Sequence, residues 1–313
     1  MTSMSTEIEQ VAARLLAEFD TNKVHVYKHP VKAVIIRLIK QLQQALFPGY
    51  FENTRIKNST MAHRLCFLLD DIVSVLARQI NFALQFSRQC QNDPGDVTGY
   101  TAADIASQFI ARLPDLREYL EYDIEAAYEG DPAARNKSEV IISYPGVYAV
   151  MVYRLAHELH LLSVPIIPRM MTEYAHGVTG IDIHPGATIG KHFFMDHGTG
   201  IVIGETTIIG DHVKVYQGVT LGALSTSGGR QLKHVKRHPT ICDHVTIYSG
   251  ASIFGGETVI GENAVIGGNA FVVKSIPSQT RVSIRNPELL YKNRSDSAAQ
   301  SELEQSGDWF YMI

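Results

Sequence analysis

The sequence predicts an α+β protein in which an α-helical N-terminal part precedes a coil of short β-strands. Aliphatic side chains recur every six residues between residues 181 and 272, and glycine often follows them. The first half of the chain instead carries apolar stripes with three- and four-residue spacing. A repeat of fixed length is the sequence signature of a solenoid, whereas the wider spacing predicts amphipathic helices.

The six-residue repeat occurs in four runs. They are Ile183, Ile189, Met195 and Ile201; Ile203, Ile209, Val215 and Leu221; Ile241, Ile247 and Ile253; and Ile260, Ile266 and Val272. Each repeat would supply one strand and one corner, and three strands per turn would give a prism of about eighteen residues per coil. The phase shifts between Met195 and Ile203, and again between Ile253 and Ile260, which we interpret as corner insertions. The alternative, an antiparallel β-domain, would not keep a six-residue phase.

Helical stripes cover most of the residues before the coil. The predicted helices are 6–19, 31–46, 59–90, one from about Thr101, 114–128 and 144–161. We expect Pro165 and Pro168 to break the last of these helices, 144–161, before the coil starts, since proline interrupts helices. The predicted domains are an α-helical domain at 1–175, a coil domain at 176–285 with a loop excursion at 222–238, and a flexible tail at 286–313.

Bulk composition excludes several classes of protein. A net charge of -4 gives no support for nucleic-acid binding, which favours a basic face. Three widely spaced cysteines form no metal or disulfide pattern, which fits a reducing cytoplasm. The most apolar stretch, 140–156, is short for a membrane span and contains Arg154. We therefore expect a cytoplasmic protein that binds neither nucleic acid nor a membrane.

Histidines gather on the predicted coil, where eight of the thirteen lie. Asp182 and His197 are fifteen residues apart, so a coil of about eighteen would nearly stack them on adjacent turns. A carboxylate beside an imidazole is the usual arrangement of a general base, which a hydroxyl nucleophile needs. A single histidine is more often exposed to solvent or hydrogen-bonded within the protein than catalytic, but the cluster of histidines favours a catalytic role.

The repeat stops between Leu221 and Ile241, where residues 222–238 form a long excursion. A loop of this length in a tight solenoid is usually functional. Its early glycines would let backbone N–H groups approach a carbonyl oxygen or phosphate. Its four cations would favour an anionic ligand: Arg230, Lys233, Lys236 and Arg237. The alternative is a solvated basic loop.

These motifs together resemble serine O-acetyltransferase, in a long-loop branch of the hexapeptide acyltransferases. The coil motifs are Asp182-Ile183-His184-Pro185, Asp196-His197-Gly198-Thr199-Gly200-Ile201-Val202-Ile203-Gly204-Glu205-Thr206, Val219-Thr220-Leu221-Gly222, Ser227-Gly228-Gly229 and Arg237-His238-Pro239. The helical motifs are Gly130-Asp131-Pro132-Ala133 and Tyr144-Pro145-Gly146-Val147-Tyr148-Ala149. The resemblance implies a left-handed parallel β-helix that transfers an acetyl group from acetyl-CoA to the L-serine hydroxyl.

The resemblance also implies a role for each matching residue. His197 would be the base that removes the serine Oγ proton, oriented by Asp182, with His238 as a third catalytic residue. Serine would be bound by four side chains, Asp131, Asp196, Arg237 and His238. Arg237 would pair with the serine carboxylate, and the two aspartates would receive its ammonium group.

Acetyl-CoA is the expected co-substrate, and no metal is expected. Coenzyme A would run between neighbouring coils and contact Gly204, Gly222 and Ala223, with Arg285 as a further candidate. Two departures from the family pattern affect the loop and the residues expected to contact the adenine end of coenzyme A. Seven residues, 230–236, separate Gly229 from Arg237, and residues 283–288 replace the usual glycine-valine-proline-alanine run.

The resemblance implies partners as well. The family assembles as homotrimers with the site between subunits, and the helical domain would suit a dimer of trimers. Family members are commonly inhibited by L-cysteine in the serine site. A terminal isoleucine carboxylate, here Ile313, would dock in O-acetylserine sulfhydrylase, as a captured C-terminus.

Three alternatives stay open at this point. Another hexapeptide acyltransferase, with a sugar or amine acceptor, would use the same coil and base. A trimeric β-helix carbonic anhydrase would use the five-residue spacing of His192 and His197, since interface histidines can hold zinc. It would leave the Arg237-His238-Pro239 motif and the helical part unexplained. A non-enzymatic scaffold would need no aligned Asp–His pair.

Overall fold

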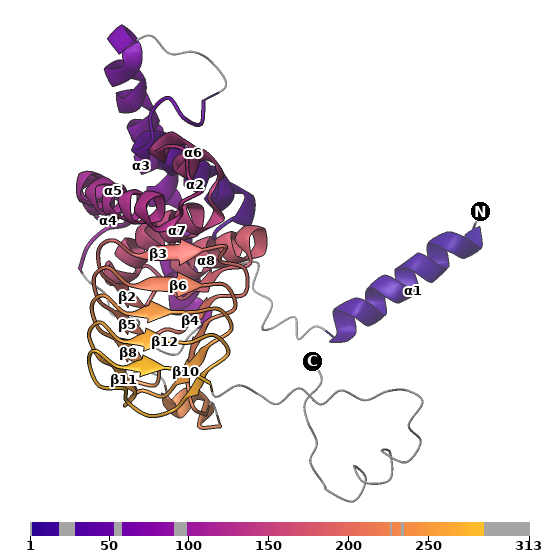
Figure 1. The fold of residues 1–313 in the computed structure, drawn as a ribbon. Coiled ribbons are helices and arrows are strands. Elements are labelled where there is room, and N and C mark those ends of the chain that lie inside the picture. The colour runs from indigo at the N-terminus through magenta and orange to yellow at the C-terminus, as the bar shows by residue number, and fades with distance from the viewer. Residues whose placement is uncertain are drawn as a thin grey trace, which may run out of the picture.

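The computed structural model describes residues 2–18, 29–52, 58–90, 99–225, 227–232 and 235–284. Within these ranges, helices come first and short parallel strands follow, as Figure 1 shows. The predicted fold class, a helical part followed by a parallel β-helix, is therefore confirmed. How the chain divides into independently folding domains stays a prediction.

The helices of the described chain agree well with the predicted ranges. They are α1 (Thr2–Glu18), α2 (Lys32–Leu46), α3 (Asn58–Cys90), α4 (Ala102–Ala111), α5 (Leu113–Gly130), α6 (Lys137–Ser143), α7 (Pro145–Leu161) and α8 (Ile167–Thr179). Two of them, α6 and α8, were not predicted. As predicted, α7 ends before Pro165 and Pro168. A further helix starts there, because Pro168 lies in the first turn of α8, where the missing N–H costs no helical hydrogen bond. Within the described ranges, no helix is long and apolar enough to cross a lipid bilayer.

The strands form three parallel sheets, in which each strand pairs with the strand one coil away. The strands are β1 (Asp182–Ile183), β2 (Thr188–Ile189), β3 (Phe194–Asp196), β4 (Val202–Ile203), β5 (Ile208–Ile209), β6 (Lys214–Tyr216), β7 (Thr220–Gly222), β8 (Thr240–Ile241), β9 (Thr246–Ile247), β10 (Ser252–Phe254), β11 (Val259–Ile260), β12 (Val265–Ile266), β13 (Phe271–Val272) and β14 (Arg281–Val282). The sheets are β1-β4-β7-β10-β13, β2-β5-β8-β11 and β3-β6-β9-β12-β14. The repeating aliphatic residues are buried along the prism, which confirms the predicted inner column.

The coils differ in length. Asp182 pairs with Val202, and Val202 pairs with Thr220, so the first coil has twenty residues and the second eighteen. The next coil, from Thr220 to Ser252, has thirty-two because it contains the loop, and the last, from Ser252 to Phe271, has nineteen. The second coil has the expected length of about eighteen residues. The extra residues of the first and last coils are the corner insertions predicted after Met195 and after Ile253.

The prism has three corners, each a stack of the segments that join one sheet to the next. We name each corner by one histidine. The His238 corner contains 184–187, 204–207, 255–258 and, of the long loop, the described residues 223–225, 227–232 and 235–239. The His192 corner contains 190–193, 210–213, 242–245 and 261–264. The His197 corner contains 197–201, 217–219, 248–251 and 267–270.

A buried ion pair joins the helices to the first coil. Nε of Arg154 in α7 donates to Oδ2 of Asp123 in α5 at 2.6 Å. The same guanidinium donates to the carbonyl oxygens of Ile189 (3.2 Å) and Gly190 (2.7 Å). The other Asp123 oxygen accepts the backbone N–H of Phe193 at 3.0 Å. These bonds satisfy backbone groups of the first coil and fix it against α5 and α7.

Candidate functional site

The His197 corner presents an imidazole to solvent. His197 has a left-handed backbone, with φ of 56°, and its side chain is 70% exposed. Asp196, at the end of β3, accepts the His197 backbone N–H at 2.9 Å and lies 3.6 Å from the ring Nδ1. Gly198 follows with φ of 86°, and a Cβ there would collide with Ile181 of the neighbouring coil. The tight corner therefore needs glycine and turns His197 outward.

A helical segment adds Asp131 and Tyr144 to this corner. The Tyr144 hydroxyl donates to Oδ2 of Asp131, and the backbone N–H of Ala133 donates to Oδ1 at 2.8 Å. These hydrogen bonds, with a smaller contribution from the nearby His197, hold the pKa of Asp131 below its ordinary value. The bond to Asp131, then burial, raises the pKa of Tyr144 to about 12, with a lesser contribution from Asp196. The four side chains thus form one cluster, and Tyr144 was not among the predicted site residues.

Asp182 does not stack on His197. The register pairs Asp182 with Val202, because the first coil has twenty residues. Among the described residues, the Asp182 carboxylate makes no hydrogen bond or ion pair. The predicted stack is wrong in its geometry, and the carboxylate beside the His197 ring is that of Asp196. The orienting role of Asp182 stays a prediction.

The His238 corner buries its imidazole, in contrast to the exposed ring of His197. His238 is only 8% exposed. Its Nδ1 accepts the backbone N–H of Thr206 at 3.1 Å and lies 2.9 Å from the Thr206 hydroxyl oxygen. Burial, followed by the nearby Arg237 charge, lowers the pKa of His238 to about 4. A Cβ at Gly204 would collide with this ring, so glycine there makes room for His238.

Arg237, the residue before His238, forms an ion pair in the same corner. The Arg237 guanidinium bonds to Glu205 and also donates to the carbonyl oxygen of Leu232 at 3.2 Å. Burial opposes ionisation of Glu205, but Arg237 and the nearby His184 hold its pKa below the ordinary value. The Nδ1 of His184 accepts the N–H of Gly186 at 3.0 Å, and burial lowers the pKa of His184 to about 4. Neither Glu205 nor His184 was among the predicted site residues, although both lie in the quoted motifs.

The residues predicted to contact coenzyme A have structural roles of their own. A Cβ at Gly222 would crowd the Phe254 ring on the next coil, just as a Cβ at Gly204 would meet His238. Ala223 is partly buried at the start of the loop. Coenzyme contacts at these positions stay predictions. Lys233, Arg285 and Ile313 lie outside the described residues.

The His192 corner carries a stack of three imidazoles. The rings of His192 and His212 have centroids 4.1 Å apart, and those of His212 and His244 are 4.8 Å apart. His192 and His197 lie on different corners, so their five-residue spacing does not bring the two rings together. In the part of the chain that the structure describes, no group of three or more His, Cys, Asp or Glu side chains is arranged to hold a metal ion.

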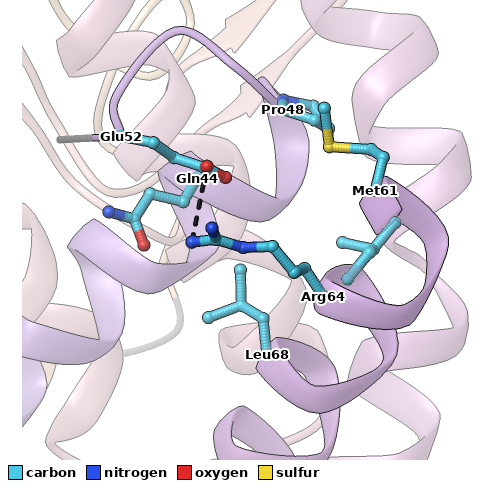
Figure 2. A pocket seen from close by; sticks show the side chains of 7 residues that line it. Gln44, Pro48, Glu52, Met61, Arg64 and Leu68 are labelled. Atoms are coloured by element: carbon cyan, nitrogen blue, oxygen red, sulfur yellow. Dashed lines mark ion pairs between the residues drawn. The ribbon is translucent and has the colours of Figure 1, made fainter. Parts of the chain in front are cut away.

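A hollow in the helical part lies apart from these corners. Figure 2 shows it between the end of α2 and the start of α3, with Arg64 directed at Glu52. Its volume is about 90 Å³, and the Arg64 Nη2–Glu52 Oε2 distance is 3.6 Å. None of the predicted site residues lines it.

The predicted site residues therefore form two clusters on one chain. His197 lies in the corner before β4, whereas His238 packs on Gly204, directly after β4. Asp131 and Asp196 belong to the first cluster, and Arg237 belongs to the second. One chain does not bring the predicted base and the predicted serine-binding pair together.

Comparisons with known proteins give the chain a family. No protein-family model matches it. A serine acetyltransferase of Synechococcus elongatus is 40% identical over 223 residues, which cover 69% of this chain and 70% of that protein. Serine acetyltransferase isoform 3 of Entamoeba histolytica, solved with cysteine, superimposes with a TM-score of 0.69 at 33% identity, covering 96% of this chain and 100% of that one. The Neisseria gonorrhoeae serine acetyltransferase, solved with serine, gives 0.52 at 28% identity, covering 79% and 95%. This chain therefore belongs to the serine acetyltransferase family.

Proposed function

We propose that this protein transfers the acetyl group of acetyl-CoA to the hydroxyl of L-serine, giving O-acetyl-L-serine and CoA. Membership of the serine acetyltransferase family supports the reaction. The observation in the fold that carries it is the exposed His197 ring, with Asp196 beside it and Asp131 nearby. A serine hydroxyl ionises far above neutral pH, so it needs a base of this kind to become a nucleophile.

In the proposed reaction, His197 removes the Oγ proton as serine Oγ attacks the thioester carbonyl carbon. The carbon–sulfur bond then breaks, and the imidazolium returns its proton to the CoA sulfur. The Asp196 carboxylate, 3.6 Å from the ring, stabilises the imidazolium while it exists. Asp182 is the second carboxylate predicted to orient the ring. The negative charges of Asp131 and Asp196 receive the serine ammonium group.

The serine carboxylate is bound by the His238 corner in this proposal. Arg237 uses only part of its five N–H groups on Glu205 and on the Leu232 carbonyl, so donors remain for a substrate carboxylate. His238 supplies a further hydrogen bond. Because the two corners lie on different edges of one prism, a homotrimer supplies both halves, with the His197 corner of one chain facing the His238 corner of the next.

The same site would accept L-cysteine as an inhibitor. Cysteine carries the ammonium and carboxylate groups of serine, with a thiol in place of the hydroxyl. The Entamoeba histolytica relative was solved with cysteine, which supports this regulation. Coenzyme A is predicted to follow the coils beside Gly222 and Ala223, where the regular repeat gives way to the loop.

Thiol release from acetyl-CoA tests the proposal. Release should depend on L-serine, and mass spectrometry should identify O-acetylserine as the product. Sugars and amines, tested at equal concentration, separate this activity from that of other hexapeptide acyltransferases. Equal or faster release with one of those acceptors would overturn the assignment of serine.

A further inference from the structure

Thr206 lies against the His238 ring and holds the end of the long loop. Its hydroxyl oxygen accepts two backbone N–H groups, that of Arg237 at 2.9 Å and that of His238 at 3.0 Å. Its own backbone N–H donates to Nδ1 of His238 at 3.1 Å, and its hydroxyl lies 2.9 Å from the same nitrogen. One residue thus makes four polar contacts with two residues that lie more than thirty positions later in the chain.

These contacts determine where the imidazole proton is. A backbone N–H can only donate, so the Nδ1 that accepts it must be unprotonated. The Thr206 oxygen has two lone pairs, and the two N–H groups of Arg237 and His238 occupy both. The only proton of the hydroxyl is therefore free to point at Nδ1. The ring proton must then be on Nε2.

We propose that Thr206 is a positioning residue that fixes His238 as a neutral imidazole with its proton on Nε2. His238 then donates a hydrogen bond to an oxygen of bound serine and does not act as a base. The part concerning serine rests on the proposed function, whereas the position of the proton rests on the contacts alone.

Two further observations agree with this assignment. Protonating Nδ1 would set its N–H against the Thr206 N–H, and burial with Arg237 nearby already lowers the pKa of His238 to about 4. The Nε2 edge of the ring packs over Gly204, where the missing side chain leaves room for it. With its pKa lowered to about 4, the ring keeps one proton, on Nε2, throughout the neutral pH range.

The test combines nitrogen NMR of histidine-labelled protein with steady-state kinetics. In the unaltered enzyme, the His238 Nδ1 resonance should be that of an unprotonated nitrogen and Nε2 that of a protonated one, at every pH between neutral and about 5.5. Thr206→Val removes the hydroxyl contacts, so KM for serine should rise about tenfold while KM for acetyl-CoA stays unchanged. The pKa of His238 should rise, because the hydroxyl no longer stabilises the neutral ring. Thr206→Ser keeps the hydroxyl and should restore both readouts.

Two results would overturn the inference. One is a proton on Nδ1 of His238 in the unaltered enzyme, and the other is a Thr206→Val enzyme that matches it in both KM and titration. A general loss of structure would raise KM for both substrates and would not be reversed by Thr206→Ser. A rise in KM for serine alone, restored by Thr206→Ser, therefore indicates a positioning role. His238→Ala distinguishes the two proposals: if it leaves KM for serine unchanged, the substrate role of His238 fails, while the NMR spectra still decide the tautomer.

Discussion

The His197 and His238 corners place the same side chain in opposite environments. His197 is 70% exposed, with a carboxylate 3.6 Å from its ring, whereas His238 is 8% exposed, with a backbone N–H directed at Nδ1. An exposed imidazole is open to a substrate, and a carboxylate beside it stabilises the imidazolium that a general base forms. A buried ring whose Nδ1 accepts a backbone N–H is suited to donate a hydrogen bond from its other nitrogen. The environment of each histidine, and not the residue type, therefore assigns its role.

The fixed charges differ in the same way. The His197 corner gathers the carboxylates of Asp131 and Asp196, while the His238 corner offers the Arg237 guanidinium. An amino-acid substrate carries one ammonium and one carboxylate, so each corner complements one end of it. Neither corner alone complements both ends, which is the physical reason to expect two chains at each site.

Removing the proposed base should have the largest effect. His197→Ala should lower kcat about a hundred- to ten-thousandfold, because general-base catalysis contributes that much, while acetyl-CoA still binds. Steady-state kinetics with equilibrium binding of acetyl-CoA measures both quantities. His212→Ala is the matched control, since His212 is also exposed and has a similar left-handed φ of 57° on another corner. Full activity of His197→Ala would show that the base lies elsewhere.

Replacing Arg237, the cation of the His238 corner, should have a smaller effect, and that effect should be on the binding of serine. Arg237→Met keeps the length of the side chain but loses its charge, so KM for serine should rise about ten- to hundredfold. Arg237→Lys should raise KM for serine less than Arg237→Met does, because lysine keeps the charge but lacks the planar fork of donors. Kinetics with each substrate varied in turn makes the measurement. An equal rise in KM for acetyl-CoA would argue against a serine-specific role.

The smallest expected effect is on the pH dependence of stability. The pKa values of His184 and His238 are lowered to about 4 in the folded protein, from the ordinary histidine value of 6.5. Between these values the unfolded chain binds more protons than the folded chain, so the free energy of unfolding should fall as pH drops through that window. Their contribution is fully present above pH 6.5.

Denaturation at a series of pH values between neutral and acid measures this slope. His184→Gln should make the slope shallower, because one group that charges on unfolding is gone. His176→Gln, at an exposed histidine in α8, is the matched control and should change the slope less than His184→Gln. The attribution to buried histidines fails if the two variants behave alike.

The sequence predicted the elements that a local period specifies. Aliphatic residues at a six-residue spacing, such as Ile189 and Ile209, are buried in the column as expected, because each coil repeats the same inward position. The predicted stack of Asp182 on His197 was wrong because it used a coil of about eighteen residues throughout. The two extra residues around Gly198, which the shift after Met195 had indicated, lengthen the first coil, so Asp182 pairs with Val202. The helix α8 was missed because Pro168 suggests an end as readily as a first turn.

The site contacts were less predictable, since they join residues distant in sequence. Thr206 and His238 meet only because the long loop returns to the coil it left. The bond between Tyr144 and Asp131 depends on how α5 and α7 pack on that coil. The family motifs contained these residues, but no spacing rule pairs them. The polar residues within the family motifs, such as Thr206 and Tyr144, were therefore the only indication in the sequence of these contacts.

Subunit complementation tests the central claim most directly. One chain carries His197→Ala and the other carries Arg237→Met together with His238→Ala, so each alone should be nearly inactive. If each site joins the His197 corner of one chain to the His238 corner of the next, random mixed trimers should regain about one quarter of the activity of the unaltered enzyme. A mixture as inactive as either variant alone would show that both corners of a single chain serve one site, and would contradict the account.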